Sequence, residues 1–163
     1  MESFLTESNK ILKLQLEPYY LSNPMDKIKE EIENKYKNKC FRDLGLIKDI
    51  KNIIQIGNPI ISRNNSFPLF SINVTIISFI PKENEILTIN INTISEQCII
   101  GNFMEKIIVL VTLESIKLKK FSFIDEKFVR GKKVLKRGTN IEVKITKIKY
   151  KNEEQYMCIS ELI

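Results

Sequence analysis

Histidine is absent from this 163-residue sequence, and glycine occurs only five times. Without histidine, the chain cannot build a Ser-His-Asp or Cys-His nucleophile system, and it lacks the side chain that most often transfers protons near neutral pH. The few glycines form neither a phosphate-cradling loop nor a dinucleotide-binding fingerprint. Carboxylate chemistry remains an alternative, but the acidic residues are scattered among lysines and are interpreted as solvated surface. We therefore expect no catalytic residue and no cofactor, and we predict that the chain is not an enzyme.

Cysteine is also scarce, and the three that occur, Cys40, Cys98 and Cys158, are far apart in the sequence. With no histidine to complete a ligand set, this spacing excludes a zinc motif and favours buried thiols in a reducing compartment. No apolar run reaches the roughly 18 residues that a membrane helix needs. The N-terminus has no basic segment followed by an apolar one. We expect no metal site, no membrane contact and no signal peptide.

A strand pattern that ends at a proline lies at the midpoint of the chain. From Phe70 to Ile76, apolar residues alternate with Ser, Asn and Thr, which is the period of a half-buried strand, and the strand is expected to end at Phe79-Ile80-Pro81. The phase slips at Ile76–Ile77, which indicates either a bulge or a change of sheet. Pro81 cannot donate a ladder hydrogen bond, and a fresh alternation follows from Leu87 to Ile91. We therefore predict a domain boundary here, between residues 1–80 and residues 81–163.

The first domain is predicted to be a small α+β unit. Leucines alternate from Leu12 to Leu16 as in a strand, and Gly45 to Ile56 is interpreted as another strand that ends before Gly57-Asn58-Pro59. One helix is expected from Pro24 to Lys39, with Asn23 as its cap and an apolar stripe that packs on a sheet. The stripe consists of Met25, Ile28, Ile32 and Tyr36.

The second domain is predicted to be all β. Five or so short strands in about eighty residues are typical of a small closed barrel such as an OB fold, which we expect to be antiparallel. A basic loop is expected from Gly131 to Gly138. The segments from which such a barrel would be built are Leu87–Ile91, Gln97–Ile100, Lys106–Leu113, Phe121–Phe123, Lys127–Val129, Ile141–Thr146 and Gln155–Ile159.

The net charge of +6 suits a polyanionic partner, and the excess gathers in the second domain. We expect weak, sequence-tolerant binding of single-stranded nucleic acid there. The alternative is a lysine-rich face that only contacts solvent. The residues predicted to bind RNA are Lys119, Lys120, Arg130, Lys132, Lys133, Lys136 and Arg137.

Three segments in a fixed order carry a family resemblance. They read LKLQLEPYYL, then, after the expected helix, DLGLIKDIKNIIQIGNPII, and finally FSINVTIISFIPKENEI. Their order and spacing resemble the seventh subunit of eukaryotic RNA polymerase II, its archaeal counterpart, and shorter relatives in large DNA viruses, including poxviruses. The motif-level resemblance runs from about Leu12 to Ile91.

The resemblance implies a non-catalytic stalk subunit of a DNA-directed RNA polymerase. Its α+β tip domain would dock on the large core subunits near the clamp, and its OB-fold barrel would lie near the RNA exit and touch nascent RNA. A partner resembling the fourth subunit is left open. The tip contacts map onto the turn at Pro18 and onto the glycine-bearing loop. The expected core-docking residues are Tyr19, Tyr20, Leu21, Gly57, Asn58, Pro59, Ile60 and Ile61. Exposed apolar residues of this kind favour a covering partner, although Tyr20 and Ile61 could instead fold back onto the helix.

The second domain departs from the cellular members of the family. Residues 95–98 read SEQC where cellular members carry Gly-Phe-Phe-like residues. Because OB folds hold single strands by stacking bases on aromatic rings, this loss argues for weak RNA binding. Phe103, Phe121 and Phe123 are candidate replacements, although the last two alternate as core residues do. The divergence and the Ile-, Asn- and Lys-rich composition favour a viral, poxvirus-like polymerase. We expect the host cytoplasm or the virion as location if the protein is viral, and the nucleus if it is cellular.

Two other classes of protein remain as alternatives. The first is a free-standing OB-fold RNA-binding protein, which would have no need of the helix-bearing first domain. The second is a purely structural assembly subunit without nucleic-acid contact, which the salt dependence of RNA binding distinguishes.

Overall fold

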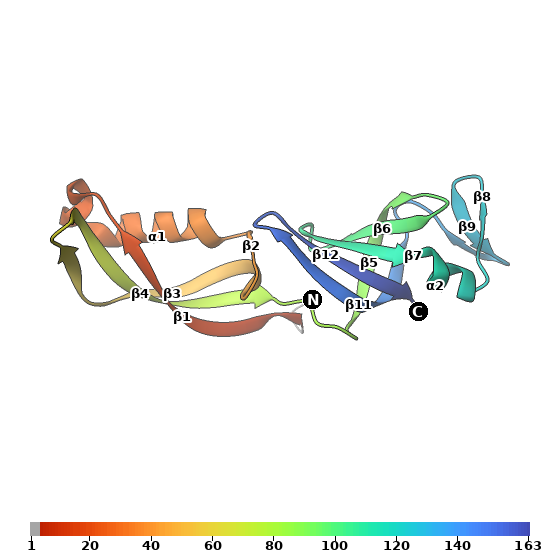
Figure 1. The fold of residues 1–163 in the computed structure, drawn as a ribbon, viewed down its shortest axis with the longest axis horizontal. Helices are drawn as coiled ribbons and strands as arrows, with labels where there is room; N and C mark the ends of the chain where they lie inside the picture. Colours follow the sequence, from red (N-terminus) through yellow and green to blue (C-terminus); the bar gives the residue numbers. More distant parts are fainter. Residues whose placement is uncertain (1–3) are drawn as a thin grey trace. The chain divides into compact units, whose positions relative to one another are not determined.

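The computed structural model describes residues 4–163 and divides into two compact units, Met1–Ile80 and Pro81–Ile163 (Figure 1). The first unit contains β1 (Thr6–Gln15), the 3-10 helix η2 (Pro18–Ser22), α1 (Pro24–Tyr36), β2 (Cys40–Phe41), β3 (Gly45–Ser62) and β4 (Asn65–Phe79). The second contains β5 (Ile86–Ile94), β6 (Cys98–Phe103), β7 (Ile107–Thr112), α2 (Leu113–Leu118), β8 (Ser122–Ile124), β9 (Lys127–Arg130), β10 (Lys133–Leu135), β11 (Asn140–Asn152) and β12 (Gln155–Leu162).

The first unit is a four-stranded antiparallel sheet, in the order β1-β4-β3-β2, with α1 across one face (Figure 1). Ile28 and Ile32 of α1 are buried against Ile72, Val74 and Ile76 of β4 in one apolar core. Met25 and Tyr36 pack against the same core, so the predicted stripe does face the sheet. The helix ends at Tyr36, before the predicted Lys39.

Asn23 does not cap α1 with its side chain, contrary to the prediction. Its Nδ2 instead donates to a carboxylate oxygen of Asp26 at 2.9 Å. Asn23 therefore contacts the first turn of the helix through its amide nitrogen and the Asp26 carboxylate, and not through a hydrogen bond from a backbone N–H to its side-chain oxygen. Pro24 suits the first helical position, because it has no N–H that would be left unpaired there.

Strand β3 is longer than predicted and passes through Gly57-Asn58-Pro59. From Ile56 to Ile60 it advances four residues while β4 advances two, from Ser71 to Leu69. The extra residues are unpaired, so Pro59 interrupts no ladder hydrogen bond. The irregularity predicted at Ile76–Ile77 of β4 is found on the partner strand instead. The extra residue is in β3, between Ile47 and Asp49, which pair with Ser78 and Ile77.

In the second unit, five strands close into a barrel in the order β11-β12-β7-β6-β5, and β5 pairs with β11 to complete it. The interior is filled by residues that alternate along the strands, such as Leu87, Ile89 and Ile91 of β5. The barrel is not wholly antiparallel as predicted, because β12 pairs with β7 in parallel. Joining parallel neighbours requires a long crossover, and residues 113–154 supply it.

That crossover holds the other departures from prediction. The six-residue helix α2 begins at Leu113, where the sequence predicts strand. The predicted basic loop contains β10, which joins β9 and β8 in a separate three-stranded sheet. Ile116 of α2 and Phe128 and Leu135 of this sheet are buried, so short elements that the pattern missed contribute to the core.

Candidate functional site

The short helix η2 presents two apolar side chains to solvent. Tyr19 is 84% exposed and Leu21 is 42% exposed. Tyr20 turns inward and packs against the core of the first unit, with Lys27 Nζ 5.1 Å from the centre of its ring. The rings of Tyr19 and Tyr20 meet edge to face with centroids 5.3 Å apart. The anchored ring of Tyr20 therefore supports the exposed ring of Tyr19.

A polar recess of about 370 Å³ lies beside η2, lined by Gln15, Leu16, Glu17, Tyr20, Lys27 and Glu31. Lys27 forms ion pairs with Glu31 at 3.0 Å and Glu30 at 3.2 Å. Hydrogen bonds to Glu31 and then to Glu30 raise the pKa of Lys27 to about 12. The recess therefore holds a permanent positive charge between carboxylates, next to an exposed aromatic ring.

The second segment predicted to dock lies on β3. Ile60 is 64% exposed and Ile61 is 67% exposed, so Ile61 does not fold back onto the helix. Gly57 has a φ of +64°, and its carbonyl accepts a hydrogen bond from Gln55 Nε2 at 2.9 Å. Asn58 is exposed and Pro59 is half-buried. This irregular stretch is thus held by a local hydrogen bond while its isoleucines reach solvent.

Strand pairing brings the two predicted docking segments to the same end of the sheet. Leu69 of β4 pairs with Gln15 of β1 on one side and with Ile60 of β3 on the other. The η2 helix begins three residues after Gln15, and the Leu16 amide donates to the Pro68 carbonyl at 3.2 Å. Segments about forty residues apart in the sequence are therefore neighbours here (Figure 1).

The face of this sheet away from α1, which we call the open face, carries exposed isoleucines that the sequence interpretation missed. Ile11 and Ile54 both pair with Asn73 and are 65% and 58% exposed. Ile56 pairs with Ser71, which lies two residues from Asn73 along β4, and Ile60 pairs with Leu69, two residues further. Opposed residues on neighbouring strands point to the same face. An apolar stripe therefore continues from Ile60 along the open face.

A signal for this stripe was present in the sequence. Ile11 directly precedes Leu12, and Ile54 directly follows Ile53, so each is out of phase with the core-facing alternation. Side chains of adjacent strand residues point to opposite faces. Two adjacent apolar residues therefore indicate a strand that is apolar on both faces.

All seven basic residues predicted to bind RNA are exposed, and the structure divides them between two places. One group surrounds the three-stranded sheet. Arg130 Nη1 donates to the Lys119 carbonyl at 3.0 Å, its guanidinium lies 4.9 Å from the centre of the Phe121 ring, and Lys133 pairs with it across the strands. Lys120 and Lys132 lie in the adjoining turns.

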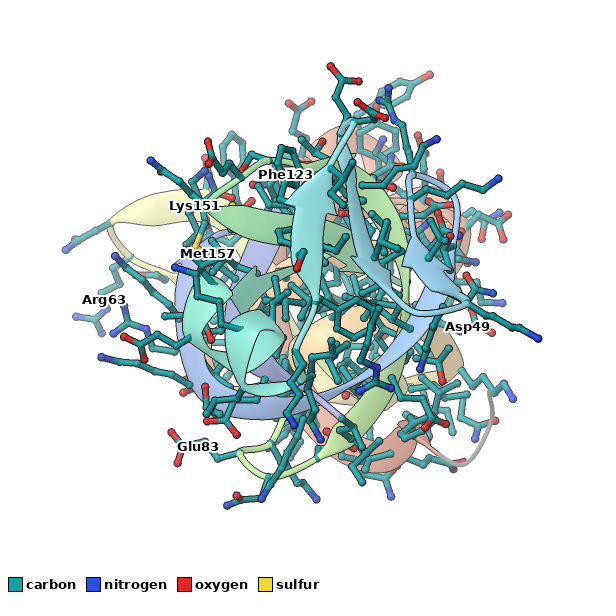
Figure 2. The ribbon with its side chains drawn as sticks, turned by 90° about the vertical axis from the view of Figure 1, so that its right-hand side faces the viewer. Asp49, Arg63, Glu83, Phe123, Lys151 and Met157 are labelled. Carbon is teal, nitrogen blue, oxygen red and sulfur yellow. The ribbon has the colours of Figure 1, made fainter. Side chains whose placement is uncertain are left out.

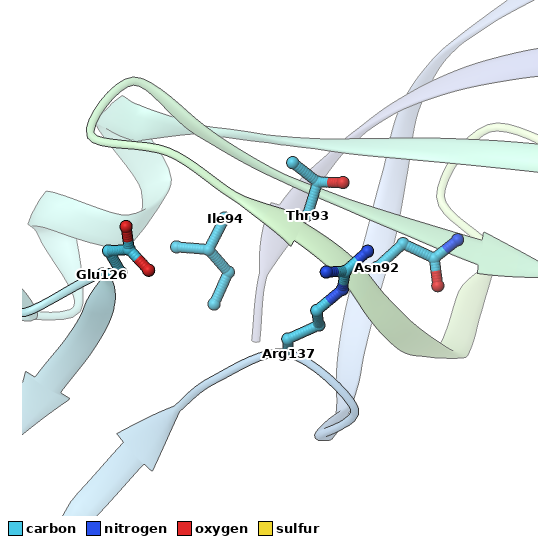
Figure 3. A pocket seen from close by; sticks show the side chains of 5 residues that line it. All are labelled: Asn92, Thr93, Ile94, Glu126 and Arg137. Carbon is cyan, nitrogen blue, oxygen red and sulfur yellow. The ribbon is translucent and has the colours of Figure 1, made fainter.

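The second group, Lys136 and Arg137, lies in the turn before β11. Hydrogen bonds between the turn and Ile91 hold it against β5. Arg137 lines a hollow of about 210 Å³ with Asn92, Thr93, Ile94 and Glu126 and extends toward β5 (Figure 3). A carboxylate in the same hollow makes this arginine a less favourable phosphate ligand than the lysines around the small sheet.

The three candidate stacking rings differ in exposure. Phe103 is 8% exposed and Phe121 is 6% exposed, so neither offers a ring face to a base. Phe123 is half-exposed (Figure 2) and lines a groove of about 490 Å³. The structure therefore leaves Phe123 as the accessible ring among the three.

Residues 4–163 contain no group of three Cys, Asp or Glu side chains that could hold a metal ion. No helix within these residues has both the length and the hydropathy of a membrane span.

One family model matches the chain. Residues 11–66 match the model described as the SHS2 domain found in N terminus of Rpb7p/Rpc25p/MJ0397. The matched range starts within β1, contains α1 and β3, and ends just inside β4. No curated protein matches the chain. The family match supports the resemblance to Rpb7-like stalk subunits and rests on the first unit alone.

Proposed function

We propose, from the Rpb7-like match over residues 11–66, that this chain is a non-catalytic stalk subunit of a multisubunit DNA-directed RNA polymerase. The match is the observation that carries the proposal, because it covers the helix and strands that support both candidate docking segments. A small barrel follows it in the chain, in the order that the resemblance implies.

The first unit docks on the large polymerase subunits near the clamp. Tyr19, Leu21 and Ile60 support this assignment, since large apolar side chains gathered at one end of a sheet are costly to expose without a partner. Aromatic and aliphatic anchors of this kind carry most of the binding energy in protein interfaces.

The second unit is an OB-type barrel that lies near the RNA exit and contacts the transcript weakly. A five-stranded closed barrel with one parallel pair, and a basic surface around its crossover, support this part of the proposal. The chemistry of RNA synthesis belongs to the large subunits, which agrees with an Rpb7-like, non-catalytic role. The composition favours a poxvirus-like polymerase as the complex.

The barrel and its basic surface also suit a free-standing RNA-binding protein, and one experiment separates the two functions. A tagged chain is purified from cells that contain its native partners, and the proteins that co-elute are identified by mass spectrometry. Recovery of the two largest polymerase subunits in stoichiometric amounts is expected. Recovery of the chain without them, while it retains RNA, would favour the free-standing protein.

A further inference from the structure

The proposed RNA contact of the second unit lacks an aromatic platform at residues 95–98, but the structure contains a ring elsewhere that fits the same task. Phe123 lies on β8, in the crossover outside the five barrel strands. We propose that the groove lined by Phe123 is a base-stacking subsite for single-stranded RNA. This inference rests on the proposed function and specifies where the RNA lies.

The Phe123 ring is held ready for stacking. It pairs across the strands with Phe128, and the two ring centroids are 5.2 Å apart. Phe128 is buried, so it forms a fixed support beneath the half-exposed ring. A base that stacks on Phe123 therefore loses little free energy in ordering the protein side chain.

The groove has the size and the polar groups that a nucleotide requires. Its volume of about 490 Å³ lies within the range of small-molecule sites, and it is lined by Glu96, Gln97, Leu113, Lys117, Phe121, Ser122, Phe123 and Phe128. The amide of Gln97 can both donate to and accept from a base edge. Lys117 supplies a positive charge for a phosphate.

Charge around the groove favours a nucleic acid over a peptide. Lys119 and Lys120 follow Lys117 at the end of α2, and all three are exposed. Against them stand the carboxylate of Glu96, which lines the groove, and that of Glu114, which is exposed in the first turn of α2. The three lysines attract the phosphates of a nucleic-acid strand that runs along the C-terminal end of α2. They would attract an acidic peptide equally, but such a peptide would not use the Phe123 ring and the Gln97 amide as a stacked base does.

The test measures binding of a short, fluorescein-labelled, unstructured RNA to the full chain by anisotropy over a range of salt concentrations. Phe123→Leu keeps the apolar volume beside Phe128 but removes the π face, and it is expected to weaken binding about tenfold without changing the salt slope. Phe123→Tyr is expected to bind as the wild type does. Lys117→Gln is expected to reduce the salt slope by about 0.7, and Glu96→Gln is expected to strengthen binding.

Ile124→Ala is the matched control, since Ile124 is the next residue of β8, is 54% exposed and does not line the groove. Thermal melts of every variant verify that the fold is retained. Wild-type affinity in Phe123→Leu would overturn the subsite while leaving RNA binding and polymerase association intact. Loss of polymerase co-purification in Phe123→Leu, with RNA affinity unchanged, would place a protein on the groove and also overturn it. If the wild type binds no RNA, both the subsite and the proposed RNA contact fail, whereas co-purification still tests the stalk assignment.

Discussion

The backbone of Gly45 lies against the carbonyl group of Phe79 so closely that a Cβ atom at Gly45 would overlap the carbonyl oxygen. Gly45 also has a φ of +73°, which side chains rarely tolerate. This close approach joins the start of β3 to the end of β4. We predict that Gly45→Ala lowers the free energy of unfolding by at least about 2 kcal/mol, as measured by urea denaturation.

Gly57→Ala is the control for this change. Gly57 has a similar φ of +64°, but nothing lies within 4 Å of its Cβ position. Gly57→Ala should therefore introduce backbone strain alone, which lowers the free energy of unfolding by about 1 kcal/mol. Equal losses in the two variants would show that the proximity of Phe79 contributes nothing beyond the dihedral angle.

Ile60→Asp is expected to detach the chain from its polymerase without unfolding it. Ile60 is exposed, so the charge costs little in the free chain, whereas burial in an interface would leave it unpaired. Interface anchors commonly cost about 2 kcal/mol or more when truncated, which corresponds to a large loss in co-purified core subunits. Ile61→Asp tests the neighbouring side chain separately.

Ile86→Asp in the second unit, where the side chain is 53% exposed, controls for a new surface aspartate. Wild-type recovery of the core with Ile60→Asp, Ile61→Asp and the double variant would mean that docking uses another surface. Recovery that also falls with Ile11→Asp or Ile54→Asp would extend the docking surface along the open face.

Charge reversal should show which of the two basic groups contributes more to RNA binding. Lys132→Glu with Lys133→Glu changes the group around the small sheet, and Lys136→Glu with Arg137→Glu changes the turn beside β5. We expect the first pair to weaken RNA binding more and to flatten the salt slope by about 0.7 for each phosphate that is no longer neutralised. Lys29→Glu with Lys35→Glu on α1 is the control of equal charge. RNA affinity that is unchanged in both pairs would identify the basic residues as a solvated face.

The carboxyl group of Asp49 contributes to the stability of the first unit, and this contribution is lost in acid. The backbone N–H of Ile50, 3.0 Å away, lowers the pKa of Asp49 below its ordinary value of 3.8, and Lys37 at 3.3 Å adds to the effect. Because the pKa is lower in the folded state, the contribution is present above 3.8 and is lost as the pH falls toward the folded value. Asp49→Asn should therefore lower Tm at neutral pH by a small amount, and the difference should disappear in acid.

Lys37→Gln should reproduce only part of that difference, since the backbone hydrogen bond is the larger cause. A Tm difference between Asp49→Asn and the wild type that stays constant from neutral to strongly acidic pH would contradict this account.

Thiol reactivity should rank the cysteines by burial. Burial, and secondarily the charge of Glu85, raise the pKa of Cys158 to about 12, and Cys40 is fully buried as well. Cys98 is half-exposed. A disulfide reagent at mildly alkaline pH should label Cys98 in the folded protein and the other two only after unfolding. Cys98→Ser should remove the fast phase, and fast labelling of Cys158 in that variant would contradict the buried barrel interior.

Local patterns predicted the elements that obey a single periodicity. The stripe on α1 and the alternation in β4, β5 and β11 each reflect one buried face, which a short window of sequence records. The helix α2 left no such record, because six residues with Ile116 as their buried apolar side chain form less than two full turns. Proline and glycine at 57–59 indicate an end to β3, and only its pairing with β4 shows that the strand continues past an unpaired stretch.

The candidate docking surface could be predicted only in part for the same reason. Tyr19 and Ile60 were recognisable as apolar residues that are costly to expose. Their placement at the same end of the sheet, where Leu69 pairs with both Gln15 and Ile60, depends on register between strands far apart in the sequence. The groove at Phe123 depends on a pairing with Phe128 and on the approach of residues 96 and 97, which no periodicity encodes.

The insertion of β12 between β7 and β11 has a consequence for how the protein is made. Every strand of the first unit precedes residue 80, so that unit can assemble while synthesis continues, but the barrel cannot close until residues 155–162 leave the ribosome. Until then β7 and β11 each present a free edge to other chains. A chain interrupted late in translation would therefore combine a finished sheet in its first unit with an open, aggregation-prone sheet in its second unit.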